Sequence, residues 1–311
     1  MRGRVRRRVL DAAFLVVALA GLGWTLASQA GALRSAWHRL DAGDVLAAAG
    51  WAALGLVAQL VSWRALLASA GPVPSFVDSA DVYFRAQLGK YVPGGVWTVV
   101  GQARFGGAHG VSRTRGTVVA LGALAVLLVV GGAVAVAGLL AGSPGAVARW
   151  SWLLPLVALG AACLAPPVLD RLLALGLRVL RRPGDAVTVH GGQVARSAAA
   201  ALAMWVAFGL HATALVAALR PVTAADALLA TGAFALAWVV GLLVVVAPAG
   251  AGAREAALVV ALGPLLDRPD ALLVALVSRV LMAVLDAAAA GVAAGAAGAV
   301  RRRGARRTAG A

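Results

Sequence analysis

The segments Leu88–Trp97, LGKYVPGGVW, and Ala247–Glu255, APAGAGARE, determine how this chain is expected to fold. Each combines a proline, which lacks a backbone N–H and ends a helix, with glycines, which adopt backbone angles that other residues resist. Lys90 is the only lysine among 28 basic residues, and Glu255 is the only glutamate among 12 acidic residues. The sequence therefore predicts two helix breaks, each beside an unusual charge. The first break consists of Pro93, Gly94 and Gly95, and the second of Pro248, Gly250 and Gly252.

The chain around these breaks is strongly apolar. Hydrophobic residues make up 62% of it, charged residues 13%, and the mean hydropathy is +0.90, values far from those of an average soluble domain. A bilayer core about 30 Å thick takes about 20 apolar residues per helical crossing, and several runs reach that length. The sequence predicts an all-α, polytopic membrane bundle.

Eight membrane segments are expected. They are residues 9–28, 45–63, 116–141, 150–169, 198–219, 224–246, 254–266 and 271–300. The first follows a cluster of arginines and resembles a signal peptide, but its length favours an uncleaved anchor. Gln59 and Arg64 indicate where the second leaves the membrane. The seventh measures only roughly 20 Å at 1.5 Å per residue, so it is predicted to be a half-helix.

Residues 71–115 differ from the apolar runs on either side. A plain cytoplasmic loop is one interpretation, but a structureless loop of that length is uncommon. The pattern favours a semi-polar helix over 73–92, ended by Pro93, followed by a segment over 96–105 that re-enters the membrane. Arginines among leucines over 170–182 predict a basic helix at the membrane interface.

The distribution of charge predicts the topology. If the N-terminus is cytoplasmic and all eight segments cross, most of the 28 basic residues lie inside, as the positive-inside rule requires. The net charge of +16 is spread over short clusters between apolar runs, which argues against a nucleic-acid partner. We expect a basic cytoplasmic N-terminus over 1–8, one transmembrane domain over 9–300 and a basic cytoplasmic tail over 301–311.

A weak internal repeat relates the two breaks. The elements near 72–141 and 222–300 each place a helix-length segment before the break and an arginine after it, Arg104 or Arg254. Paired interrupted segments in corresponding halves are typical of the binding site of a transporter.

A broken helix at membrane depth predicts a cavity, because its unpaired backbone groups need protein or water partners. The N-terminus of a half-helix attracts an anion such as phosphate. The candidate substrate-binding residues are Lys90, Arg104, Arg254, Glu255, Arg279 and Asp286.

Each candidate also has a structural interpretation. Lys90 and Arg104 also fit as cytoplasmic anchors, and Arg254 with Glu255 as groups that neutralise others. Arg279 lies inside an apolar run, where an ionised side chain costs at least about 2.5 kcal/mol. Asp286 lies two turns further on the same helix face. These two either share an intermediate group or pair separately, with Glu255 and with another arginine.

No catalytic or metal-binding pattern is present in the sequence. His38, His109, His190 and His211 lack the spacing of metal ligands, and His211 is expected to be a hydrogen-bonded interior residue rather than a proton relay. There is no GxSxG, Walker A or HExxH motif. We expect a protein that is not an enzyme and needs no cofactor or metal.

The run LGKYVPGGVW with Arg104 after it, and APAGAGARE followed by VALVSRVLMAVLD at 274–286, resemble the lysylphosphatidylglycerol synthase transmembrane-region family. The resemblance extends over roughly residues 10 to 300 and highlights the two motifs. It implies a flippase-like membrane domain. The residues carried over are Lys90, Pro93, Gly94, Gly95, Trp97, Arg104, Pro248, Gly250, Gly252, Arg254, Glu255 and Arg279.

The chain departs from the family pattern in two respects. Many relatives carry a glutamate in the span after the first motif, whereas residues 117–141 contain no acidic residue. The sequence also shows no soluble aminoacyl-transferase domain, so this chain alone is not expected to make lysylphosphatidylglycerol.

Three functions are compatible with these features. The first is a bacterial inner-membrane lipid translocase or transporter-like protein that binds an anionic lipid or a polyprenyl-phosphate-linked substrate. The second is a non-catalytic membrane subunit that partners a glycosyltransferase or lipid-modifying enzyme of the cell envelope. The third is a membrane enzyme that uses Glu255 as an acid or base.

Overall fold

The structure is a computed structural model, and it describes residues 39–69, 71–92, 96–142, 145–179, 189–244, 250 and 252–309, with single residues between 13 and 27. Four residues of the predicted breaks, Pro93, Gly94, Gly95 and Pro248, lie outside the described residues, as does most of the predicted first span. The described part is helical and contains no strand, which confirms the all-α fold class.

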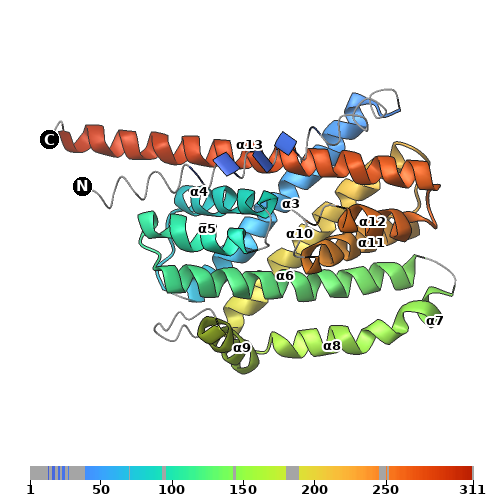
Figure 1. Ribbon diagram of the computed structural model, residues 1–311, viewed down its shortest axis with the longest axis horizontal. Helices are drawn as coiled ribbons and strands as arrows, with labels where there is room; N and C mark the ends of the chain where they lie inside the picture. The colour runs from blue at the N-terminus through green and yellow to red at the C-terminus, as the bar shows by residue number, and fades with distance from the viewer. Residues whose placement is uncertain are drawn as a thin grey trace.

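Five described helices are long and apolar enough to cross a membrane (Figure 1). They are α3 (Ala42–Ser69), α6 (Arg113–Ala141), α10 (Gly191–Ala217), α11 (Ala224–Leu243) and residues Arg268–Arg303 of α13 (Arg268–Ala309). A bent helix pair adds a sixth candidate. The prediction of a polytopic membrane protein is confirmed, whereas the described residues do not reach the predicted count of eight spans.

The predicted span over 150–169 is not one straight helix. After α7 (Ala146–Trp150) and the short η3 (Ser151–Leu153), α8 (Leu154–Cys163) ends and α9 (Pro166–Val179) leaves at 83°. The cause is Pro166 followed by Pro167, because proline lacks the N–H that would continue α8 but suits the first turn of a new helix.

Helix α9 buries three leucines and leaves its arginines exposed. Leu169, Leu173 and Leu177 are buried against the bundle, while Arg171 and Arg178 are exposed. This is the amphipathic pattern of a helix lying at an interface. The helix predicted over 170–182 is thus present with different bounds, and its position at the membrane surface stays a prediction.

The semi-polar stretch before the first break forms a shorter helix than predicted. Instead of one helix over 73–92, α4 (Phe76–Gln87) is followed by the 3-10 turn η1 (Leu88–Tyr91). Ser75 caps α4, its hydroxyl accepting a hydrogen bond from the Asp78 N–H at 3.1 Å. The segment predicted over 96–105 forms α5 (Trp97–Phe105) and continues into η2 (Gly106–His109).

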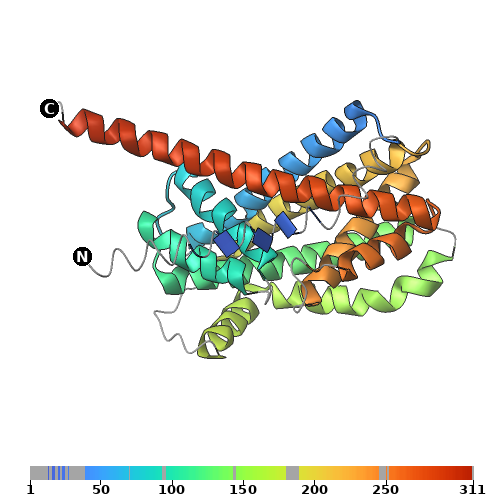
Figure 2. The same ribbon diagram turned by 45° about the horizontal axis from the view of Figure 1, so that its top comes forward.

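Two units therefore share one order: a helix, a break, a short helix and a long apolar helix. In the first unit α4 packs on α5 and α5 on α6, and in the second α11 packs on α12 (Ala253–Leu262) and α12 on α13. Both views show α13 running along α4 and α12 (Figures 1 and 2). The internal repeat stays a prediction, and these matching contacts are what it rests on.

Glycines allow the long helices to approach closely. At the crossing of α6 and α11, a Cβ added to Gly138 would lie 2.7 Å from the Gly232 Cα, and Gly142 faces Leu229. Small residues spaced four apart permit such backbone contact in membranes. Buried Trp205, Phe208 and Phe234 pack against one another in the hydrophobic core.

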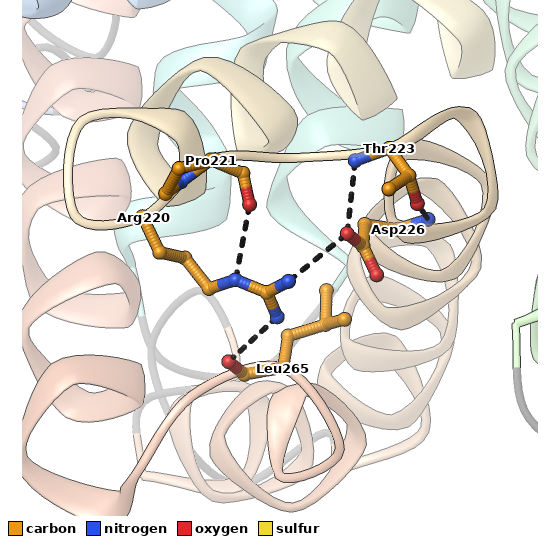
Figure 3. A network of polar contacts seen from close by, with 5 residues as sticks. All are labelled: Arg220, Pro221, Thr223, Asp226 and Leu265. Atoms are coloured by element: carbon orange, nitrogen blue, oxygen red, sulfur yellow. Dashed lines mark hydrogen bonds and ion pairs between the residues drawn. The ribbon is translucent and has the colours of Figure 1, made fainter.

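The turn between α10 and α11 is tied to the segment that follows α12, as Figure 3 shows. Thr223 and Asp226 form a capping box at the start of α11, which satisfies helix-end N–H groups. Arg220 contacts Asp226 at 3.1 Å and donates to the Leu265 carbonyl at 3.1 Å. The turn at Arg220-Pro221 thus also anchors the chain that leads into α13.

Replacing Arg220 by alanine is expected to lower the free energy of unfolding by about 1 kcal/mol, the usual net value of a hydrogen bond to a backbone carbonyl. Equilibrium unfolding in SDS mixed micelles measures the change. Arg268→Ala is the matched control, since Arg268 is an exposed arginine for which the structure gives no hydrogen bond, and its change should stay within about 0.5 kcal/mol. Equal effects of the two substitutions would contradict the anchoring role.

Candidate functional site

A cavity of about 160 Å³ lies between the two units. Gln59 of α3, Leu127 of α6 and Phe208 of α10 contribute to its wall from interior turns of apolar helices. Three predicted cations also line it, namely Lys90, Arg254 and Arg279, which we call the cationic cluster. A space of this size holds several water molecules or a small polar headgroup.

Arg279 reaches the cavity from α13 and pairs with Glu255 of α12. Both residues are buried, with 6% and 8% of their surface exposed. Glu255 also accepts a hydrogen bond from the Gly252 N–H at 2.6 Å. The carboxylate of Glu255 therefore already occupies the helix N-terminus that the sequence predicted as an anion site, and it compensates the buried guanidinium.

Lys90 reaches the cavity from η1 and pairs with Asp286 of α13. Its Nζ lies 2.6 Å from the Asp286 Oδ2, and the Tyr91 hydroxyl donates to the same oxygen at 2.6 Å. Of the two arrangements that the sequence left open, Arg279 and Asp286 pair separately. The partner of Asp286 is the lysine beside the first break rather than the expected arginine, because η1 packs against α13 at that level.

Arg254 differs from the other two cations. The structure gives it no carboxylate partner within salt-bridge distance, and its Nη2 is buried without a hydrogen-bond partner among the described residues. Its guanidinium lies over the Phe234 ring, 5.0 Å from the centroid. A cation–π contact stabilises the charge only in part, and a buried donor without a partner costs about 1–3 kcal/mol. Arg254 is therefore the cation with unused hydrogen-bonding capacity at the cavity.

The other three predicted substrate-binding residues do not line the cavity. Glu255 and Asp286 pair with cations that line the cavity, and Arg104, in the last turn of α5, is not among the lining residues. Of the break residues, Gly250 lines the cavity with φ +69° and approaches the Gly241 Cα. Gly252 caps α12 with φ +83°.

Sequence reasoning missed three buried glutamines that line the cavity. Gln59, Gln87 and Gln102 come from α3, α4 and α5 and have 7%, 8% and 5% of their surface exposed. Gln59, which the sequence placed near the membrane exit, lies within the longer helix α3 and lines the cavity, and its depth in the membrane stays a prediction. A glutamine within an apolar run is itself a signal, since a buried amide needs partners.

His211 is the interior residue that the sequence predicted. Its side chain is fully buried, with Nδ1 2.9 Å from the Ala48 carbonyl and Nε2 2.9 Å from the Ser278 hydroxyl. It joins α3, α10 and α13. Both ring nitrogens are used structurally.

Residues 11–290 match the family described as the lysylphosphatidylglycerol synthase TM region. The chain belongs to that family. The match covers the first unit, most of the second and every residue of the cavity wall, so the resemblance inferred from the two break motifs is confirmed. Membership of the lysylphosphatidylglycerol synthase TM region family indicates a multi-pass membrane protein concerned with lipids. No curated protein matches the chain.

Proposed function

We propose that this protein is a lipid translocase of the bacterial inner membrane, which binds the headgroup of an anionic lipid or polyprenyl-phosphate-linked substrate in the cavity between its two units. The observation that carries the proposal is Arg254, a buried guanidinium at the cavity with an unpartnered Nη2. An anionic oxygen placed there would supply the missing acceptor. The acyl or prenyl chains would stay in the bilayer.

The ion pairs around the cavity support a binding role rather than covalent chemistry. Glu255 holds Arg279, and Asp286 holds Lys90. Neither carboxylate lines the cavity, so neither is presented to a substrate there. We therefore propose that the protein moves its substrate without making or breaking covalent bonds. Cytoplasmic N- and C-termini complete the proposal, on the distribution of arginines.

Translocation by the purified protein tests this function. Proteoliposomes containing phosphatidylglycerol with a fluorescent acyl chain report flipping through quenching by external dithionite. Arg254→Gln removes the charge while keeping a polar side chain. Losing a hydrogen bond to a charged group, about 1.5–3 kcal/mol, should slow flipping about tenfold or more.

The control for this experiment is Arg178→Gln, an exposed arginine on α9 that does not line the cavity. It should flip lipid at the rate of the unchanged protein. Equal rates for Arg254→Gln and the unchanged protein would refute the proposed role of the cavity. Absence of flipping by the unchanged protein, together with stoichiometric co-purification of an envelope enzyme, would instead favour the membrane-subunit function.

A further inference from the structure

We infer that the cavity selects a monoanionic phosphodiester whose headgroup is neutral and hydroxylated, such as glycerol or a sugar, and excludes a headgroup that carries an amine. This inference rests on the proposed function and names the substrate class of the same site. It follows from the charges at the cavity and from the hydrogen-bonding groups that its wall leaves unused.

The charge of the site matches one negative charge. The three cations of the cationic cluster face two carboxylates, Glu255 and Asp286, among the described residues. The two breaks contain no ionisable residue. One positive charge is left, on Arg254. A phosphodiester carries a single negative charge, whereas a phosphomonoester or diphosphate brings more charge than the site compensates.

The three glutamines leave hydrogen-bonding groups free beside that charge. Gln102 accepts from the Trp63 Nε1 at 2.7 Å, so its amide N–H groups remain. Gln87 donates to the Tyr83 hydroxyl at 2.7 Å, so its carbonyl oxygen remains. Gln59 is buried at the cavity, and the described residues give it no hydrogen-bond partner.

These groups form what we call the neutral wall, consisting of Gln59, Gln87 and Gln102. A hydroxyl both donates and accepts, so neighbouring hydroxyls suit a mixed set of amide N–H and carbonyl groups. Each glutamine is more than nine-tenths buried, and buried polar groups are normally hydrogen-bonded. The neutral wall thus recognises a hydroxylated headgroup while Arg254 holds the phosphate.

The described cavity wall offers no carboxylate to neutralise an ammonium group beside its three cations. The lining residues include no aspartate or glutamate. The Asp286 Oδ1 is buried without a hydrogen-bond partner among the described residues. However, Asp286 does not line the cavity, and Lys90 and Tyr91, which contact its other oxygen, do. The ammonium group of an aminoacyl or ethanolamine headgroup would add a further positive charge beside the three of the cationic cluster and would be repelled by them.

Binding of chemically matched lipids to the purified full chain tests this selectivity. Native mass spectrometry compares phosphatidylglycerol with three lipids of identical acyl chains. Phosphatidylmethanol keeps the phosphodiester but has no hydroxyl, phosphatidylethanolamine adds an amine, and lysylphosphatidylglycerol adds two. A polyprenyl-phosphate hexose also has a phosphodiester and a hydroxylated headgroup, but it carries a polyprenyl chain in place of the acyl chains. Comparing it with phosphatidylglycerol shows which of the two lipid types the site binds.

We expect phosphatidylglycerol, the polyprenyl-phosphate hexose or both to bind at least tenfold more tightly than the two amine lipids. Phosphatidylmethanol should bind with intermediate affinity. Gln59→Leu should remove the preference for phosphatidylglycerol over phosphatidylmethanol without weakening phosphatidylmethanol itself. Arg254→Gln should weaken all the anionic lipids tenfold or more.

The possible failures are distinguishable. Tight binding of lysylphosphatidylglycerol, lost in Asp286→Asn, would overturn the inference and identify Asp286 as an amine acceptor. Equal binding of phosphatidylglycerol and phosphatidylmethanol, still dependent on Arg254, would overturn the role of the neutral wall but leave the proposed function intact. If Arg254→Gln leaves the affinity for every lipid unchanged, both the selectivity inferred here and the proposed function are refuted.

Discussion

Glu255→Gln is expected to lower the free energy of unfolding by about 3–5 kcal/mol, because removing one partner of a buried ion pair leaves the other charge uncompensated. The glutamine oxygen still accepts from the Gly252 N–H, so the cap of α12 is retained. The substitution therefore isolates the loss of charge beside Arg279, which is only 6% exposed. Equilibrium unfolding in SDS mixed micelles measures the change.

A surface ion pair provides the control. Arg39 and Asp270 lie 2.5 Å apart with side chains 45% and 22% exposed, and exposed pairs contribute about 0–1 kcal/mol. Arg39→Ala should therefore cost less than about 1 kcal/mol. The double variant Glu255→Leu with Arg279→Met should be more stable than Glu255→Gln, since it removes both buried charges. A double variant as unstable as the sum of its single changes would contradict a direct pair.

Gly138→Ala is expected to cost about 1–3 kcal/mol through overpacking at the crossing of α6 and α11. The new Cβ would lie 2.7 Å from the Gly232 Cα, a distance that backbone atoms relieve only if the helices separate. Alanine is more favourable than glycine in a helix by about 1 kcal/mol. This gain in helix propensity offsets part of the steric cost, so a net loss of stability indicates a larger steric effect.

Gly132→Ala is the matched control for this crossing, because it changes the same residue type on the same helix. A Cβ at Gly132 meets no atom within 4 Å, so this variant should be as stable as the unchanged protein or slightly more stable. Thermal unfolding in detergent compares the two. If both substitutions raise the midpoint temperature alike, α6 and α11 do not make the close contact described.

The sequence predicts the general architecture well because membrane-spanning helices follow directly from apolar length. The five long helices lie where apolar runs were found, and the shortness of α12 follows from the distance between Gly252 and Pro264. The 83° bend before α9 is harder to predict. Two adjacent prolines end one helix and start another, but the sequence does not give the angle between them.

The candidate site is only partly predictable. Charged residues in apolar surroundings identify Lys90, Arg254 and Arg279, since such residues are costly unless partnered. Their pairing depends on which elements pack together, so the sequence left the partner of Asp286 open. The neutral wall was missed because glutamines at helix ends and glutamines in a cavity look alike until the helices are assembled.

The length of α13 has a mechanical consequence. Arg279 and Asp286 project from one continuous helix, roughly 10 Å apart along its axis at 1.5 Å per residue. Arg279 forms an ion pair with Glu255 of α12, the short helix after the second break. Asp286 forms one with Lys90 of η1, the turn before the first break. One helix therefore links the turn before the first break to the short helix after the second, so a shift of α13 along its axis would strain both ion pairs at once.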